Sequence, residues 1–269
     1  MFVDFDRPQL RPAGPWLAEF PTVVIVHTGP GADHTPYKEH VGPALAPVAQ
    51  VVYFDLRGCG RSDRSTPEHW NTTTWSDDLR TLLGTLGVER PVLLGAGWGA
   101  FTALRFAERW PDDISKLILA NPTARLVVPR IVARFDELAG PEAGEAAHTY
   151  FEHPDEHSIG EYLRVCFHTM VAPEHALSLL LEQRWNLDLA VHWTDTEART
   201  IDLQADLGVI HAPTLVLAGT HDPQYPPASI DEVLRGLRAP EVRWYEGARH
   251  ALFRDAPETL DAVREFIVR

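Results

Sequence analysis

Short apolar runs rich in β-branched residues recur along the chain and predict strands. Each run has the length of one strand and is apolar at nearly every position. Such continuous apolar character is typical of parallel strands buried on both faces, because helices cover each face of a parallel sheet. The predicted strands are Thr22–Val26, Val51–Phe54, Val92–Leu94, Lys116–Leu119, Thr214–Leu217 and Val242–Tyr245.

Amphipathic stretches alternate with these runs. Thr74–Leu86 and Trp98–Trp110 repeat apolar residues at helical spacing, and Leu260, Val263 and Ile267 do the same near the C-terminus. Strands that alternate with helices predict an α/β protein with a mostly parallel central sheet and helices on both faces.

The alternation stops between residues 123 and 206. This stretch is rich in His, Glu and aromatic residues, and its pattern is helical or irregular throughout. The clearest helical patches are Arg130–Leu138, Ile159–Met170 and Glu174–Leu189. We therefore expect a core over residues 1–122 and 207–269, with residues 123–206 inserted as a helical cap (lid) over the carboxyl edge of the sheet.

Composition and charge narrow the function classes. The chain is 45% hydrophobic and 23% charged, which is ordinary for a globular protein. Its net charge of −14 argues against a nucleic-acid partner, since phosphate binding needs clustered Lys and Arg. No apolar run has the length of a membrane span, and Asp4 and Asp6 make the N-terminus unlike a signal or transit peptide. We expect a cytoplasmic monomer or homodimer that does not bind membranes.

Unusual residues gather where the predicted strands end. The loop His27–Gly31 follows the first run, and the small-residue turn Gly95–Gly99 follows the third. Asp222 follows the fifth run, and His250 follows the sixth. Because ligands of open α/β sheets bind beyond the carboxyl ends of the strands, these residues predict a single site at that edge.

The turn Gly95–Gly99 has the strand–turn–helix form of a nucleophile elbow, G-x-S-x-G, with Gly97 in place of the serine. The backbone N–H of Trp98, at the start of the helix, is expected to stabilise an oxyanion. Gly29, or less favourably Thr28, is expected to supply the second N–H.

Asp222 and His250 complete this predicted site. Nucleophile position, acid and histidine follow one another along the chain in the order that the elbow motif requires. The carboxylate of Asp222 is expected to fix the tautomer of His250 and to stabilise the ring when it takes up a proton. We therefore interpret the two residues as a catalytic pair beside Gly97.

These motifs resemble the α/β-hydrolase superfamily and, within it, the proline-iminopeptidase-like peptidases. That group typically shows His-Gly-Gly-Pro-Gly, Asp-Gln-Arg-Gly-x-Gly-x-Ser and Gly-x-Ser-Trp-Gly. This chain has His-Thr-Gly-Pro-Gly from His27, Asp-Leu-Arg-Gly-Cys-Gly-Arg-Ser from Asp55 and Gly-Ala-Gly-Trp-Gly from Gly95. The resemblance implies an α/β-hydrolase fold with a capped pocket for a small-molecule substrate.

The resemblance covers the core and extends only weakly into the cap. Peptidases of this group hold the free amine of a substrate with cap carboxylates beside tryptophans. The run from Glu182 to Trp185 is similar to one such segment, but a Trp-x-x-Trp-Glu run is absent. We take Glu182, Trp185 and Phe167, together with Thr28, as candidate substrate-binding residues and do not expect aminopeptidase activity.

Other interpretations of the same residues are weaker. The turn at Gly97 fits a G-x-G-x-x-A dinucleotide loop, but Asn121 rather than an acidic residue follows the next predicted strand. His153 and His157 flank acidic residues without a third defined ligand, so we expect no metal and no cofactor. Cys59 lacks an activating neighbour in sequence and is interpreted as a small buried residue.

Gly97 leaves three functions open. A native enzyme, repurposed for a small organic molecule of specialised metabolism, uses His250 and Asp222 as a general acid/base pair. Alternatively, the chain is an engineered knock-out in which glycine replaces the serine of a hydrolase, an esterase or a proline-iminopeptidase-like enzyme, to trap it for substrate binding, and no acyl-enzyme forms. In the third, the protein binds a ligand without chemistry. We favour the first, because a binder does not need a His–Asp pair and a designed knock-out is more naturally alanine.

Overall fold

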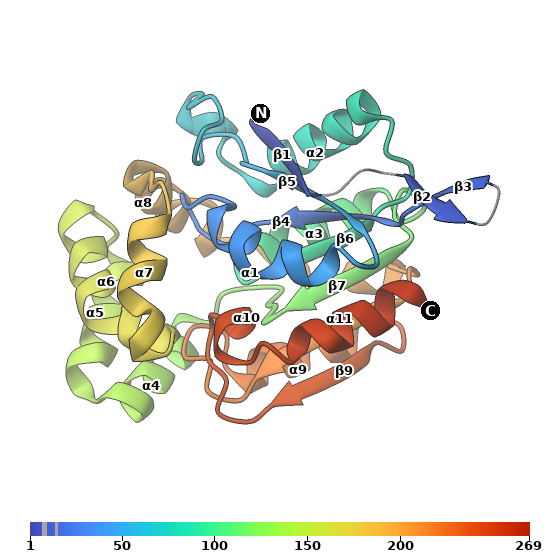
Figure 1. Cartoon of the computed structure of the whole chain (residues 1–269). Coiled ribbons are helices and arrows are strands. Elements are labelled where there is room, and N and C mark those ends of the chain that lie inside the picture. Colours follow the sequence, from blue (N-terminus) through green and yellow to red (C-terminus); the bar gives the residue numbers. More distant parts are fainter. Residues whose placement is uncertain (7–9, 14–15) are drawn as a thin grey trace.

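A computed structural model describes residues 1–6, 10–13 and 16–269. Its strands are β1 (Val3–Asp6), β2 (Leu10–Ala13), β3 (Trp16–Glu19), β4 (Thr22–Val26), β5 (Gln50–Phe54), β6 (Val92–Ala96), β7 (Lys116–Ala120), β8 (Thr214–Gly219) and β9 (Glu241–Tyr245). Seven of them form one sheet in the order β1-β5-β4-β6-β7-β8-β9, and β2 and β3 form a separate hairpin (Figure 1).

The sheet is parallel except at one edge. Strands β4 to β9 pair in parallel with their neighbours, whereas β1 pairs with β5 in the antiparallel direction. All the predicted strands are present, each within two residues of its predicted bounds, and the mostly parallel sheet is confirmed. Strand β1 was not predicted, because an edge strand that leaves Phe5 exposed lacks the continuous apolar pattern.

The expectation that every strand is buried on both faces is wrong for β9. Val242 and Trp244 are 37% and 39% exposed. The physical reason is the position of β9 at the end of the sheet, where no further strand follows it. Apolar character alone does not separate such an edge strand from a central one.

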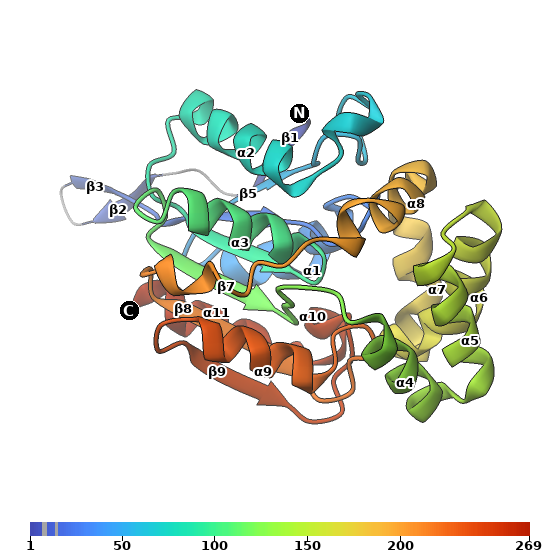
Figure 2. The same ribbon diagram turned by 180° about the vertical axis from the view of Figure 1, so that it is seen from behind.

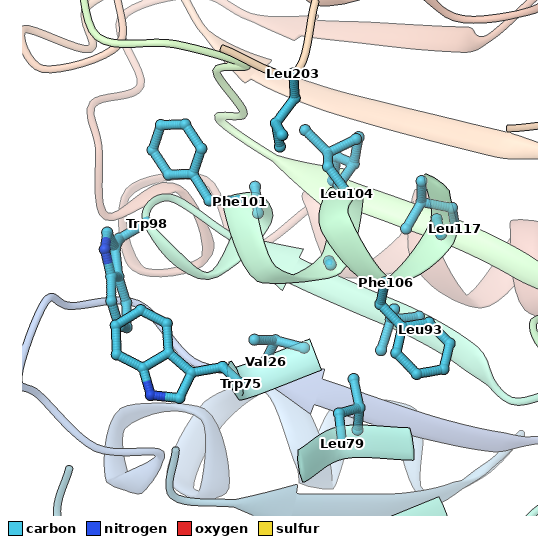
Figure 3. Packing of buried hydrophobic residues seen from close by; sticks show 14 of the residues in the cluster. Val26, Trp75, Leu79, Leu93, Trp98, Phe101, Leu104, Phe106, Leu117 and Leu203 are labelled. Carbon is cyan, nitrogen blue, oxygen red and sulfur yellow. The ribbon is translucent and has the colours of Figure 1, made fainter. Parts of the chain in front are cut away.

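Helices cover both faces of the sheet (Figures 1 and 2). One face packs against α2 (Thr72–Leu86), α3 (Gly99–Arg109) and α9 (Pro227–Gly236), and the other against α1 (Thr35–Leu45), α10 (Leu252–Asp255) and α11 (Thr259–Val268). Successive strand residues divide between the two layers, as the pleat requires. Figure 3 shows the first layer, where helix residues pack against strand residues. The helix residues include Trp75 and Leu79 of α2 and Phe101 and Leu104 of α3, and the strand residues include Val26, Leu93 and Leu117.

A group of helices follows β7 and precedes β8, at one end of the sheet (Figure 1). It comprises α4 (Val128–Ala139), α5 (Pro141–Glu152), α6 (Glu156–Met170), α7 (Pro173–Glu182) and α8 (Leu187–Asp195). The group has its own apolar core around Phe135, Tyr150 and Tyr162. Within the described ranges, no helix is long and apolar enough to cross a membrane. The described residues also form 3₁₀ turns at Pro67–His69, Glu197–Arg199 and Leu207–Val209.

The histidines around residue 155 lie where α5 ends and α6 begins: His153 is the C-cap residue of α5, and His157 is in the first turn of α6. Asp155 caps α6, since its side chain accepts the N–H of Ser158 at 2.6 Å while Ser158 Oγ accepts the N–H of Asp155 at 2.8 Å. This reciprocal capping explains an acidic residue between two histidines without a ligand. In the described part of the chain, no group of three or more His, Cys, Asp or Glu side chains is placed to hold a metal ion.

The predicted helix Glu174–Leu189 is in fact two helices, α7 and α8, separated at residues 183–186. Loops at the edge of the sheet accept hydrogen bonds from the residues between the two helices. The N–H of Asn186 donates to Gly31 O at 2.8 Å, its Nδ2 donates to Gly58 O at 2.8 Å, and the N–H of Arg184 donates to Asp33 Oδ2 at 3.2 Å. These long-range bonds override the helical pattern of the sequence.

Candidate active site

His250 and Asp222 meet beyond the ends of the neighbouring strands β8 and β9. His250 Nδ1 lies 2.8 Å from Asp222 Oδ2. The carboxylate is fully buried, and its other oxygen accepts the N–H groups of Gln224 at 2.8 Å and Tyr225 at 3.0 Å. Asp222 therefore holds the Nδ1–H of the ring, and His250 lines a cavity at its other side.

Asn121 is a site residue that the sequence interpretation missed. It follows β7 in a left-handed conformation, φ +46°, which asparagine tolerates better than most residues. Its Nδ2 donates to the carbonyls of Arg249 at 2.8 Å and His250 at 3.2 Å, and its Oδ1 accepts the N–H of Gly219 at 2.8 Å. One side chain thus ties together the ends of three strands and fixes the backbone of His250.

Gly97 lies in the tight turn between β6 and α3 with a left-handed backbone, φ +52°. A Cβ atom at this position would lie 2.8 Å from both His250 Nε2 and Thr28 Oγ1. A Cβ at the next small residue, Gly99, would lie 2.4 Å from the carbonyl oxygen of Val26. The glycines therefore allow α3 to start directly against the end of β4 and bring Gly97, His250 and Thr28 together.

The two expected N–H donors border the same turn. The structure packs Gly29 against the indole of Trp98, since a Cβ at Gly29 would lie 2.8 Å from Trp98 Cε3. In the hydrogen bonds that the described residues form, neither Trp98 N–H nor Gly29 N–H donates to another group. Both remain available to a ligand oxygen, and their role as an oxyanion hole stays a prediction.

The loop that carries Thr28 rests on a buried histidine. His27 Nε2 accepts the N–H of Leu56 at 3.1 Å, and its Nδ1 donates to Thr28 O at 2.7 Å. Burial lowers the pKa of His27, which keeps the ring neutral as this bonding pattern requires. On the other side, the N–H of Thr28 donates to the hydroxyl of Tyr37 at 3.2 Å.

A second His–Asp pair lies behind this loop. Asp55 accepts the His34 Nδ1–H at 2.6 Å, and also the backbone N–H groups of His34 at 3.1 Å and Arg61 at 2.8 Å. Burial alone would raise the pKa of Asp55, but the hydrogen bonds from His34 and from the backbone of Arg61 lower it to about 2. Ser62 Oγ donates to the carbonyl of Asp55 at 2.5 Å, so residues 55–62 form a hydrogen-bonded turn.

One cavity joins the catalytic candidates to the helices α5–α8. Thr28, Gly29, Gly97 and His250 line it from the sheet side. Phe167 and Trp185, both predicted to bind substrate, line it from the helical side. Most of the remaining wall is aromatic or aliphatic, and includes Tyr37, Tyr150, Phe151, Tyr162, Leu163, Met170, Trp193 and Phe253.

The structure does not bring Glu182 into this lining. Its carboxylate forms an ion pair with Arg254, a residue 72 positions away that does line the cavity. Among the described residues that form the wall, none is a carboxylate, and Arg254 is the one permanently charged side chain. The cavity therefore offers an apolar surface whose single cation is already neutralised.

Comparison with known proteins identifies the family. Residues 21–257 match the family described as the α/β hydrolase fold. The chain therefore belongs to the α/β-hydrolase family, and the predicted fold class is confirmed. The match includes Gly97, Asp222 and His250 within its bounds.

The relatives are hydrolases with diverse names. A proline iminopeptidase from Levilactobacillus brevis is 26% identical over 276 residues, which cover 94% of this chain and 89% of the relative. An α/β-hydrolase superfamily protein from Bacillus subtilis is 27% identical over 247 residues, 90% of this chain and 89% of that protein.

Solved structures give the same assignment. A proline iminopeptidase-related protein from Thermus thermophilus is 27% identical with a TM-score of 0.75, and the match covers 100% of this chain and 98% of that one. An enol-lactonase from Burkholderia xenovorans has a TM-score of 0.74 at 20% identity, covering 99% and 96%. This second likeness is one of fold alone.

Proposed function

We propose that this protein is an α/β-hydrolase-fold enzyme that transfers protons on a small, uncharged, largely apolar substrate without a covalent intermediate. One observation carries the proposal. His250 is held by Asp222 through Nδ1 at 2.8 Å and lines a cavity at a turn where Gly97 has no side chain. Glycine offers no nucleophilic atom, so the acyl-enzyme of a serine hydrolase cannot form at this turn.

The proposed chemistry uses the groups around Gly97 in order. His250 Nε2 accepts a proton from a carbon or oxygen of the substrate, and Asp222 stabilises the resulting imidazolium. Negative charge then develops on a substrate oxygen, which the N–H groups of Trp98 and Gly29 stabilise. The proton returns from His250 to another atom of the same substrate, so no co-reactant is consumed. A positioned general base of this kind contributes roughly 10²–10⁴-fold to a rate.

The cavity wall supports the substrate class. Aromatic and aliphatic side chains bind apolar surface, and a charged ligand would lose its hydration without gaining a partner. A substrate with a free amine is disfavoured because Glu182 is already paired with Arg254. We infer that residues 123–206 act as a cap on a core of residues 1–122 and 207–269, and that the cap keeps water from the reacting atoms.

The second candidate is a hydrolase that has lost its serine. The names of the relatives favour it, since proline iminopeptidases are hydrolytic enzymes. The two candidates differ in what the unaltered chain can do. A proton-transfer enzyme is active as it stands, whereas an inactivated hydrolase is not.

Exchange of the α-hydrogens of 2-tetralone in D₂O tests the proposal. This uncharged aromatic ketone needs a base for its C–H and donors for its enolate oxygen. We expect the chain to accelerate the exchange, measured by mass spectrometry, and His250→Ala to reduce the acceleration roughly 10²–10⁴-fold. His211→Ala is the matched control, because His211 pairs with Asp112 at 3.0 Å on the exposed surface.

Three outcomes would contradict the proposal. One is unchanged exchange in His250→Ala. Another is a covalent adduct of the unaltered chain with a fluorophosphonate, because that would reveal a nucleophile. The third is saturable binding of 2-tetralone without any exchange, which would identify a binding protein.

A further inference from the structure

The space beside Gly97 is occupied by two side chains from other loops. A Cβ atom at Gly97 would lie 2.8 Å from Thr28 Oγ1 and 2.8 Å from His250 Nε2, closer than real Cβ atoms approach their neighbours. The two atoms converge on the point from which any side chain at position 97 must start. A serine there requires at least one of them to move.

His250 has little freedom to move aside. Its Nδ1 is fixed by Asp222 at 2.8 Å, and the ring of Tyr225 packs edge-on against it with centroids 5.1 Å apart. The amide of Asn121 holds its carbonyl oxygen at 3.2 Å. A shift of the ring therefore breaks its contacts with Asp222 and Tyr225, while Asn121 holds the backbone from which the ring projects.

Thr28 is anchored as firmly. Its N–H donates to Tyr37 Oη at 3.2 Å, and its carbonyl accepts the His27 Nδ1–H at 2.7 Å. Rotation about χ1 is the movement left to it, and a β-branched side chain has few favourable χ1 positions. The anchored backbone therefore keeps the Thr28 side chain beside the turn.

We infer that Thr28 is a positioning residue that takes the place a nucleophile side chain would need at position 97. The hydroxyl that faces the catalytic end of the cavity comes from the loop after β4, and not from the turn after β6. A substrate oxygen bound over Gly97 can accept a hydrogen bond from the Thr28 hydroxyl while His250 accepts a proton from a neighbouring substrate atom. The inference concerns the space at the turn, so it does not depend on the proton transfer proposed above.

Fluorophosphonate labelling of serine variants tests this inference. In Gly97→Ser, the introduced hydroxyl would attack phosphorus, its proton would pass to His250 Nε2, and fluoride would leave. We expect Gly97→Ser alone to label at least tenfold more slowly than Gly97→Ser combined with Thr28→Ala, which removes Oγ1. Gly97→Ser combined with Thr28→Val is the matched control, because valine keeps a γ atom in the same space and should remain slow.

Thermal unfolding gives a second measurement that needs no reactivity. We expect Gly97→Ala to lower Tm more in the unaltered background than it does with Thr28→Ala, since the two positions compete for one space. Equal Tm losses in the two backgrounds would overturn the inference.

Each labelling outcome is equally decisive. Labelling of Gly97→Ser at the rate of its Thr28→Ala combination shows that Thr28 is no obstacle. Fast labelling of the Thr28→Val combination shows that the γ position is not responsible. No labelling of any folded variant shows that removing Thr28 does not open the turn. None of these results alters 2-tetralone exchange by the unaltered chain, so the two proposals fail independently.

Discussion

Among the described residues, two histidines pair with fully buried aspartates at similar N–O distances. His250 Nδ1 lies 2.8 Å from Asp222, and His34 Nδ1 lies 2.6 Å from Asp55. The His250 side chain is 12% exposed and lines the cavity, whereas His34 is 3% exposed and stacks on Phe2 with centroids 5.7 Å apart. A candidate catalytic histidine is therefore distinguished by access of its ring to a cavity, and not by pairing with a carboxylate.

The carboxylates of the two pairs also differ in their tasks. Asp222 accepts the N–H groups of the turn that follows it in sequence, so its bonds other than that to His250 are local. Asp55 accepts groups from two separate segments, His34 and Arg61, and its own carbonyl accepts Ser62. We interpret the first pair as chemical and the second as structural.

The largest expected effect separates the pairs by activity. Asp222→Asn keeps the shape of the side chain but no longer stabilises the protonated ring of His250, so 2-tetralone exchange should fall roughly 10³–10⁴-fold. Asp55→Asn should leave the exchange per folded molecule within a few fold. Mass spectrometry on samples corrected for folded fraction measures both. Equal losses in the two variants would refute the assignment of roles.

The next effect concerns stability, where we expect the Asp55 pair to matter more than the Asp222 pair. Asp55→Ala leaves three donors from two segments without their acceptor, and should lower the free energy of unfolding by about 3–5 kcal/mol. Asp222→Ala should lower it by about 1–3 kcal/mol, because its other partners belong to one turn. Urea denaturation measures both. A larger loss for Asp222→Ala would contradict the comparison.

The pH dependence of stability gives a smaller effect of the same origin. The pKa of Asp55 is about 2 in the folded protein, below its ordinary value of 3.8. The unfolded chain therefore binds this proton first on acidification, and the stabilisation by Asp55 is complete above pH 4 and is lost as the pH falls toward 2. The stability difference between the unaltered chain and Asp55→Asn should shrink by about 2 kcal/mol over that range. A constant difference in urea denaturation would show that Asp55 does not titrate in this way.

The smallest expected effect concerns the connection between the helices that line the cavity and the loops beside the site. Asn186→Ala removes the 2.8 Å bond to Gly58 and the cap of α8, and should cost about 1 kcal/mol. Because Asn186 connects the helices to the loops beside the site, KM for 2-tetralone exchange should rise more than kcat falls. Thr200→Ala is a control, since its hydroxyl bonds only locally to Glu197 on the surface. An equal change of KM in both variants would count against a role for this connection.

Much of the fold was predictable because it depends on local pattern. The strands β4 to β9 are short and apolar, and the residues that follow them, among them Asp222 and His250, are necessarily brought to one edge. The break between α7 and α8 was not predictable, since Asn186 bonds to Gly31 and Gly58, far away in sequence. The same limit applies to the pairing of Glu182 with Arg254.

Only those features of the site that follow from the order of residues along the chain were predictable. The order of Gly97, Asp222 and His250 indicates their proximity, but no local pattern reports that Asn121 ties three strand ends together. Nor does sequence spacing show that Thr28 Oγ1 and His250 Nε2 converge on Gly97. Such facts arise from loops that meet in space and need coordinates.

The left-handed backbone of Gly97 also bears on how this site can evolve. Any L-residue at φ +52° carries roughly 1–3 kcal/mol of backbone strain that glycine avoids. A nucleophilic side chain at this position therefore costs stability that glycine does not. Acquiring one is an evolutionary step that first makes the protein less stable.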